Sequence, residues 1–228
     1  LGRESGVQMM KERRGLIPDT QWKQEKKKQP WYLGETFNAA IGQGYVAVTP
    51  FQMARLTSVV ASGGYFYPPS LLMVNQKPEP MGKVKIKDET LDTVKKALFG
   101  VVNENGGTAG SARSSLVQIS GKTGTAQVVG LRRDSKHLSE MYRDHAWFVA
   151  FAPYEAPEIA LSVMVEHGGH GGAAAAPIAK RAIEAYMKSS KQSAEGSSSL
   201  AHLKVQESAD QNKKAVKDGE SENRSTPH

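Results

Sequence analysis

The sequence predicts an α+β domain in which an antiparallel sheet is flanked by helices. Two amphipathic helical patterns come first along the chain, and three strand-like runs rich in β-branched and aromatic residues follow them. A short polar turn separates the last two runs, which favours an antiparallel hairpin. A further helical pattern closes the domain, and we find no internal repeat. This grouping of helices and consecutive strands is typical of the α+β class.

The first predicted helix covers residues 49–62. Thr49 is placed to cap it, Pro50 suits its first turn, and Gly63-Gly64 ends it. Its predicted buried stripe follows a helical spacing and consists of Phe51, Ala54, Leu56, Val59 and Val60.

The second predicted helix covers residues 88–103. We expect Asp88 to be its N-cap and the run 105–107 (Asn-Gly-Gly) to end it. Its predicted stripe consists of Leu91, Val94, Leu98, Val101 and Val102.

Three strands are predicted next, over residues 117–129, 145–152 and 159–165. The closing helix covers residues 173–187, and its inward residues are predicted to be Ile178, Ala182, Ile183 and Tyr186. We therefore expect one domain over residues 1–188. Residues 189–228 are polar and have no aromatic residue, so they are predicted to be a disordered tail.

Composition narrows the possible functions. The chain has 228 residues, no cysteine and a net charge of +7, all of it carried by residues 1–188. The absence of cysteine excludes a disulfide scaffold, a thiolate metal site and a cysteine nucleophile. A basic body is compatible with binding nucleic acid, but no motif or patterned aromatic residue supports that reading, and we predict no nucleic-acid partner.

Two glycine clusters each suggest a ligand site. Residues 42–47 (GQGYVA) fit a loose dinucleotide pattern, but no acidic residue lies between Glu35 and Glu79 to bind a ribose, so we reject that reading. Residues 167–172 (HGGHGG) hold two histidines three positions apart, which is a weak metal pattern without a third ligand. A strand-to-helix turn explains these glycines better.

The informative run is residues 120–127, SGKTGTAQ. A lysine, two hydroxyls and a bare backbone on one strand can bind an extended peptide that ends in a carboxylate. Lys122 would neutralise the charge, Thr123 and Thr125 would donate to it, and Gly124 would let the peptide lie alongside as an extra strand. On a regular strand Lys122 and Thr123 point to opposite faces, so both can serve only if the strand borders a groove or bulges.

These residues stand within a longer resemblance. KTGTAQ, HAWFVAFAP and AAAAPIAKRAIEAY resemble the end of a penicillin-binding transpeptidase domain. Upstream, GLIPDTQW, WYLGETFNAAIGQGYVAVTPFQMA and ASGGYFYPP are similar to class B, elongation-type penicillin-binding proteins of rod-shaped bacteria. The resemblance covers residues 4–187 and implies the C-terminal portion of the serine β-lactamase/transpeptidase-like fold.

The resemblance also implies roles for the site residues. Lys122 would hold the charge of the site and assist proton transfer. The hydroxyls of Thr123 and Thr125 would bind the terminal carboxylate of a D-Ala-D-Ala stem peptide or of a β-lactam. The backbone N–H of Thr125 would form half of an oxyanion hole. No metal or other cofactor is implied.

One departure from the family pattern concerns the nucleophile. Such enzymes also use a Ser-x-x-Lys and a Ser-x-Asn motif. No serine in this sequence has a lysine three residues later, and the only Ser-x-Asn, at residues 221–223, lies in the polar tail. We expect the nucleophile and a membrane anchor N-terminal to Leu1, and the chain alone to be inactive.

Two function hypotheses follow. The first is a fragment of a peptidoglycan D,D-transpeptidase of the cell-wall elongation complex, at the periplasmic face of the bacterial inner membrane. The second is a catalytically incomplete binding or scaffold module of a cell-wall complex.

Overall fold

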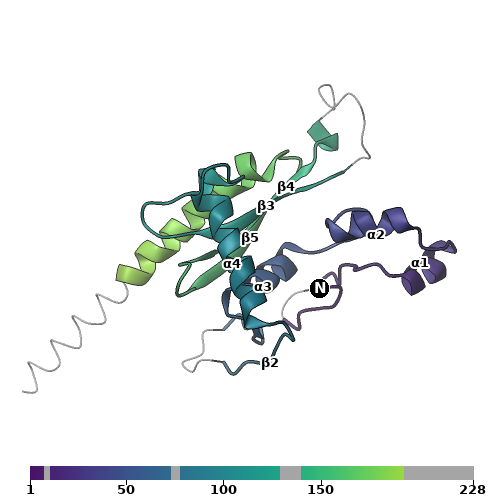
Figure 1. Ribbon diagram of the computed structural model, residues 1–228, viewed down its shortest axis with the longest axis horizontal. Coiled ribbons are helices and arrows are strands. Elements are labelled where there is room, and N and C mark those ends of the chain that lie inside the picture. The colour runs from purple at the N-terminus through teal and green to yellow at the C-terminus, as the bar shows by residue number, and fades with distance from the viewer. Residues whose placement is uncertain (8–10, 73–77, 129–139, 193–228) are drawn as a thin grey trace, which may run out of the picture. The chain divides into compact units, whose positions relative to one another are not determined.

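The computed structural model describes residues 1–7, 11–72, 78–128 and 140–192 (Figure 1). Leu1–Glu184 form one compact unit, and a second unit begins at Ala185, of which residues 185–192 are described as helix. The elements in chain order are α1 (Thr20–Lys27), α2 (Leu33–Ala40), α3 (Pro50–Ala61), β1 (Tyr65–Phe66), β2 (Gly82–Lys83), α4 (Asp88–Asn103), η1 (Gly110–Ala112), β3 (Ser120–Ala126), η3 (Glu140–Tyr142), β4 (His145–Ala152) and β5 (Ile159–Val165). The predicted α+β class is confirmed.

The main sheet has three antiparallel strands in the order β3-β4-β5. The predicted hairpin of β4 and β5 is confirmed with the predicted bounds. The strand β3 is shorter than the predicted residues 117–129, of which residue 129 lies outside the described part. Its pairing with β4 runs without interruption from Ser120↔Phe151 to Ala126↔His145, so β3 is a regular strand at one edge of the sheet.

The two helices predicted over residues 49–62 and 88–103 form as α3 and α4. Thr49 caps α3 by accepting a hydrogen bond from Gln52 N, and Pro50 is in the first turn. The predicted cap of α4 is wrong, because Lys87 is its N-cap and Asp88 is its first residue. There the Asp88 carboxylate suits the positive end of the helix dipole and accepts from Lys83 Nζ at 2.7 Å.

The predicted stripes are only partly correct. Phe51 and Leu56 of α3 are 41% and 42% exposed, whereas Gln52 and Thr57 are buried. The reason is polar: Gln52 Nε2 donates to two backbone carbonyls of the N-terminal segment, Arg3 O and Arg14 O. This hydrogen bonding turns the Gln52 face of α3 inward. In α4 the predicted Val94 is likewise exposed, while Leu91 and Val102 are buried.

The last helix is described from residue 171 to residue 192, so it is longer at both ends than predicted. Its buried residues within the compact unit are Gly171, Ala175, Ala176, Ala179 and Ile183. Ile178 and Ala182 are exposed and Tyr186 is 41% exposed, so those three inward assignments are wrong. Small alanines let a helix pack close to a sheet. Residues 193–228, most of the predicted tail, lie outside the described residues.

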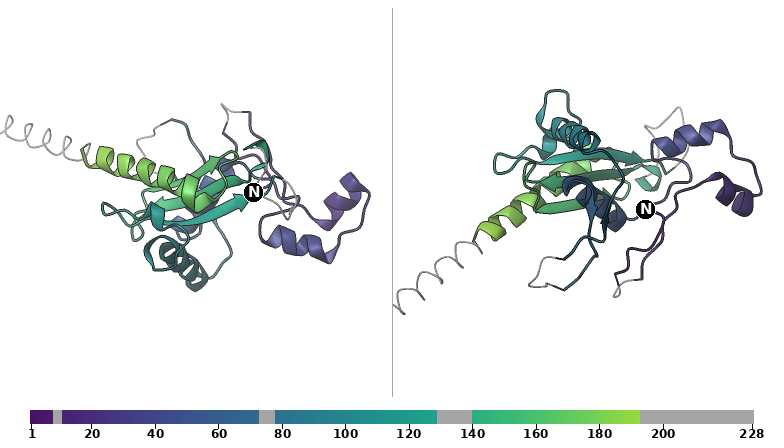
Figure 2. Two further views of the ribbon diagram at one scale, coloured as in Figure 1. Left: turned by 90° about the horizontal axis from the view of Figure 1, so that it is seen from above. Right: turned by 60° about the horizontal axis from the view of Figure 1, so that its bottom comes forward.

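The core lies around β4, whose Phe148 and Phe151 are fully buried together with Ile119, Val102 and Ile183. Figure 2 shows α4 and the start of the last helix on opposite sides of the three strands. The short β1–β2 pair and the helices α1 and α2 are elements that the sequence patterns did not predict.

The start of the last helix packs directly onto β3. A Cβ on Gly171 would lie 2.5 Å from Gly124 O and 3.1 Å from Gly124 N, with Trp147 O closer still. The predicted strand-to-helix turn is thus a close backbone approach that needs glycine.

Replacing Gly171 by alanine should therefore destabilise the fold by about 1–3 kcal/mol, the usual cost of overpacking. The measurement is the urea midpoint of unfolding. Gly34→Ala is the matched control, because Gly34 lies in α2 with nothing within 4 Å of its Cβ position. That control should be neutral or stabilising. Equal midpoints for Gly171→Ala and the unsubstituted chain would contradict this packing.

Candidate active site on the open edge of the sheet

Lys122 lies near the middle of the edge strand, and its side chain is exposed. Its Nζ donates to Thr123 O at 2.8 Å and lies 3.3 Å from Thr123 Oγ1. The two side chains leave opposite faces of a regular strand, yet their polar ends meet. They meet because, among the described strands, none pairs with β3 on its outer side, so the long lysine side chain bends around the edge. The edge position provides the arrangement, and no bulge is needed.

Thr123 belongs to a small hydroxyl cluster. Its Oγ1 lies 3.0 Å from the Oγ1 of Thr108, which follows α4 in the chain. Nearby, Ser111 Oγ donates to Gly172 O at 2.6 Å and joins the same segment to the start of the last helix. Because a hydroxyl both donates and accepts, the Thr108–Thr123 pair can still donate one hydrogen to an incoming oxygen. Thr108 was not among the predicted site residues.

The backbone groups of β3 that face outward can be identified from their partners. Thr123 O accepts from Lys122 Nζ, and Thr125 O accepts from Gln43 Nε2 at 2.9 Å. Neither donor belongs to β4. In a strand the N–H and C=O of one residue point to the same side and successive residues alternate. The Thr125 N–H therefore also points to the open edge. The half-buried Thr125 side chain is on the same face as Thr123.

Gly124 is held tightly from within the molecule. A Cβ there would lie 3.2 Å from Trp147 Cβ on the paired strand, and Gly171 packs on its backbone. Packing inside the domain therefore already favours glycine at position 124. Its predicted role in admitting a ligand strand stays a prediction.

The first glycine cluster ends α2. Gly42 has a φ of 75°, Gly42 N donates to Ala39 O, and Gln43 N donates to Asn38 O, which is the Schellman pattern of a helix C-terminus. The next helix begins only at Pro50. This geometry leaves no helix N-terminus at the glycines, which agrees with rejecting a dinucleotide site.

His167 of the second cluster has a local partner, His145 of β4. His167 N donates to His145 Nδ1 at 2.9 Å, and the two imidazole rings are 4.7 Å apart. Within residues 1–7, 11–72, 78–128 and 140–192, no group of three or more His, Asp or Glu is placed to hold a metal ion.

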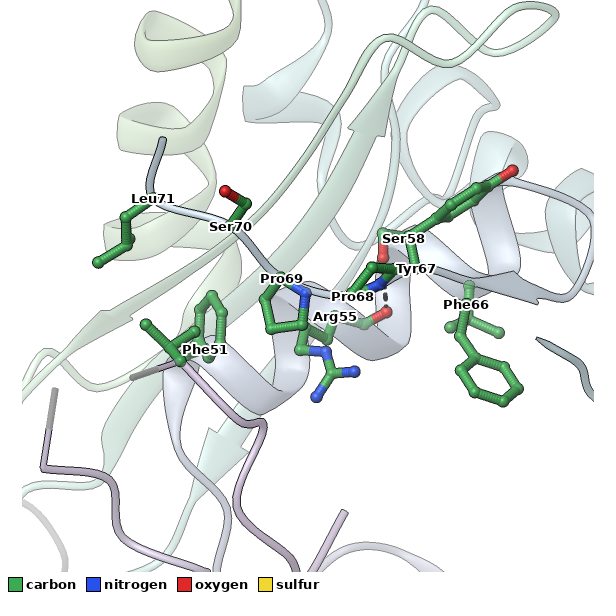
Figure 3. A pocket seen from close by; sticks show the side chains of 11 residues that line it. Phe51, Arg55, Ser58, Phe66, Tyr67, Pro68, Pro69, Ser70 and Leu71 are labelled. Atoms are coloured by element: carbon green, nitrogen blue, oxygen red, sulfur yellow. Dashed lines mark hydrogen bonds between the residues drawn. The ribbon is translucent and has the colours of Figure 1, made fainter. Parts of the chain in front are cut away.

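A pocket of about 260 Å³ lies elsewhere, between α3 and residues 66–71 (Figure 3). Figure 3 shows Phe51, Arg55 and Ser58 of α3 facing the loop that carries Pro68 and Pro69. Arg55 is its one ionisable group apart from the Tyr67 hydroxyl. An apolar pocket with one permanent cation offers no acid–base pair, and Lys122 does not line it. We therefore place the candidate site at the edge of β3.

Three comparisons with known proteins agree with this fold. The family model described as the penicillin binding protein transpeptidase domain matches residues 1–184. The peptidoglycan D,D-transpeptidase MrdA of Acinetobacter baumannii is 38% identical over 187 residues, which are 76% of this chain and 28% of that protein. Its counterpart in Haemophilus influenzae is 32% identical over 200 residues, covering 82% of this chain and 31% of that protein.

Solved structures match as well. PBP2 in a complex with MreC from Helicobacter pylori superposes with a TM-score of 0.71 at 34% identity, covering 82% of this chain and 34% of that one. Pseudomonas aeruginosa PBP2 in complex with WCK 5153 gives a TM-score of 0.70 at 36% identity, covering 81% of this chain and 41% of that one. The chain spans about a third of the length of its relatives.

An antiparallel sheet with Lys-Thr-Gly on its edge strand and helices on both sides fits the matched domain, and the chain belongs to the penicillin-binding protein transpeptidase family. Its relatives place it with class B proteins of the elongation type, as the sequence blocks indicate. The predicted transpeptidase-like fold is confirmed.

Proposed function

We propose that the chain provides the substrate-binding wall of a peptidoglycan D,D-transpeptidase. The observation that carries this is the open edge of β3, where the Lys122 ammonium, the Thr123 and Thr125 residues and an outward Thr125 N–H come together. An ammonium with two hydroxyls suits a terminal carboxylate. An outward N–H suits an oxygen that becomes negative during acyl transfer. The scaffold alternative is not favoured, because the relatives at 32–38% identity are D,D-transpeptidases.

The reaction needs this binding surface and also a nucleophilic serine. The 228 residues contain no Ser-x-x-Lys motif that would provide that serine. The serine oxygen attacks the carbonyl carbon between the two D-alanines, and the carbonyl oxygen takes up negative charge near Thr125 N–H. The C–N bond then breaks, a proton passes to the departing D-alanine amine, and an acyl ester remains. The amine of a second stem peptide attacks this ester and releases the serine. With a β-lactam the reaction would stop at the acyl ester, because the leaving nitrogen stays covalently joined to the acyl group after the ring opens.

The same relatives support a proposed substrate, class of inhibitor and cellular location. The substrate is the stem peptide of peptidoglycan, β-lactams are inhibitors, and the site faces the periplasm at the inner membrane. The Helicobacter complex with MreC supports a partner from the cell-wall elongation complex. In the described ranges no helix is both long and apolar enough to cross a membrane. We propose no nucleic-acid partner and no cofactor.

The Thr125 side chain gives the sharpest test of this assignment. Thr125→Val keeps the β-branched shape and the N–H, so it should lose about one charge-assisted hydrogen bond, on the order of 1.5–3 kcal/mol. The rate of penicillin acylation should fall roughly ten- to a hundredfold. The measurement uses a chimaera in which residues 1–228 follow the N-terminal part of the Acinetobacter transpeptidase.

A β-lactam with an esterified carboxylate is the control. The unsubstituted chimaera and Thr125→Val should react with this ester at similar, slow rates, because the interaction that distinguishes them is gone. A valine variant that is still tenfold slower on the ester would show that the substitution distorts the strand. The carboxylate role of Thr125 would then be wrong.

A further inference from the structure

A side-chain hydrogen bond ties the turn after β5 to the first residue of β4. His167 N–H donates to His145 Nδ1 at 2.9 Å, just beyond Ala146↔Val165, the last pair of the two strands at that end. Because a backbone N–H can only donate, the Nδ1 of His145 carries no proton, and the neutral ring has its proton on Nε2. The bond therefore exists only while this nitrogen is unprotonated.

The second imidazole of the pair is bonded in the opposite sense. His167 Nδ1 lies 3.1 Å from Arg143 O, and it is the donor, because a carbonyl oxygen only accepts. A proton added to His167 at Nε2 leaves both of its hydrogen bonds in place. A proton added to His145 Nδ1 instead sets a donor against the His167 N–H. The ring centroids are 4.7 Å apart, so two charged rings would also repel each other.

The bond also supports an unfavourable backbone conformation. His167 has a φ of 54°, a left-handed conformation that disfavours residues with a Cβ. Such a conformation persists only where the surrounding contacts determine it. Backbone bonds fix the two ends of the turn, from Gly168 N to Val165 O and from Gly169 N to Asp144 O. The His145 ring holds the N–H of the left-handed residue itself.

The turn leads directly into the contacts behind the Lys-Thr-Gly strand. The last helix begins at Gly171, and a Cβ there would lie 2.5 Å from Gly124 O. A Cβ on the next residue, Gly172, would lie 3.5 Å from Thr123 Cγ2. This packing leaves no free space, so a displaced turn would displace Gly124 and Thr123 as well.

The ionisable groups around His145 belong to few segments. In the described part of the chain, the charged and titratable residues of the segments packed against it lie before it or in the turn: Arg143, Asp144, Glu166, His167 and His170. The facing end of β3, residues 123–128, has no ionisable side chain. Carboxylates and guanidinium groups ordinarily keep their charge between about pH 5 and 8, whereas imidazoles change theirs. A change of the turn over that range therefore indicates a histidine.

We propose that His145 is a positioning residue whose neutral imidazole holds the turn at residues 166–170 and, through it, the Lys-Thr-Gly strand in the arrangement that supports acylation. This inference rests on the proposed function of that strand. The direction follows from the hydrogen bond. The neutral ring accepts it, so the support is present near the upper end of the range from about pH 5 to 8 and is lost as the pH falls and the ring takes up a proton.

The first test uses the 228-residue chain and needs no substitution. NMR follows the His145 ring and the amide resonances of His167, Gly124 and Thr123 while the pH is lowered from about 8 to about 5. All should titrate with the midpoint of the His145 ring, because one proton releases the turn. Amides of Gly124 and Thr123 that stay still while the ring titrates overturn the inference. A proton on His145 Nδ1 already at the upper pH overturns it too.

Two substitutions separate the acceptor from the titrating ring. His145→Asn places an amide oxygen near the position of Nδ1 and does not titrate, so the Gly124 amide should stay still over the whole range. His145→Leu has no acceptor, and its Gly124 resonance should lie near the acid position of the unsubstituted chain at every pH. His170→Ala is the matched control, because the His170 side chain is exposed. A Gly124 titration that survives in His145→Asn and disappears in His170→Ala assigns the effect to His170 and overturns the inference.

The second test measures acylation by penicillin in the chimaera between about pH 5 and 8. Dividing the rate of His145→Asn by that of the unsubstituted chimaera cancels the pH dependence of the catalytic groups that both share. This ratio should rise roughly two- to tenfold as the pH falls, which is the size of one hydrogen bond. The ratio for His170→Ala should stay constant.

The outcomes of this test separate the two proposals. A constant ratio for His145→Asn in a chimaera that acylates overturns the role of His145 and leaves the proposed function intact. A chimaera that takes up no penicillin at any pH overturns the proposed function, and the role of His145 in acylation fails with it even if the first test succeeds.

Discussion

Replacing Lys122 by alanine should slow acylation by penicillin about 10²- to 10⁴-fold in a chimaera that carries the nucleophile motifs. This is the usual size of a general acid–base contribution, and the lost ammonium also faces the ligand carboxylate. In the structure Lys122 Nζ lies at the open edge within 3.3 Å of both the carbonyl and hydroxyl oxygens of Thr123. The measurement is the second-order rate of acylation from stopped-flow fluorescence.

Two further variants separate charge from proton transfer. Lys122→Met keeps the aliphatic stem without the charge and should lose as much as Lys122→Ala. Lys122→Arg keeps the charge and should recover only part of the rate, because a guanidinium does not exchange protons near neutral pH. An alanine variant that acylates at the normal rate would show that the Lys-Thr-Gly strand is not the catalytic wall.

The 228-residue chain alone should take up no covalent label from a fluorescent penicillin. None of its serines is followed by a lysine three residues later, so the chain offers no activated serine to open the lactam ring. The measurement is a gel of the denatured protein, with the chimaera as the labelled control. A band that survives denaturation would identify a nucleophile within these residues, and Ser111, which bonds to Gly172 O beside β3, would be the first to replace.

Much of the fold could be predicted because its strongest signals are local. A Thr-Pro start and a Gly-Gly end define α3, and an apolar run that stops at a proline defines β4. The helix stripes were less predictable, because burial of α3 depends on the N-terminal segment that bonds to Gln52. Similarly, α1 is a lysine-rich helix with little apolar character, so its formation depends on the partner that neutralises Lys23.

The candidate site likewise combines residues that a local motif reveals with residues that only the folded chain brings together. Lys122, Thr123 and Thr125 could be found because they are neighbours in one motif. Gln43 could not, because 82 residues separate it from Thr125 and only the folded chain brings the two together. Thr108 was hidden for a similar reason, since its loop follows a different element from β3. A polar residue between two glycines, as in Gly42-Gln43-Gly44, was the one local sign of a special position.

The open edge of β3 also has a consequence for drug resistance. A ligand bound to Thr125 N–H is bound by an atom that every residue except proline carries, so almost no codon change can remove it. Among the groups proposed to bind the ligand at this edge, substitution can therefore remove only the Thr123 and Thr125 hydroxyls and the Lys122 ammonium. Under the proposed function the natural substrate uses those same groups, so escape from a close substrate mimic should reduce cell-wall synthesis as well.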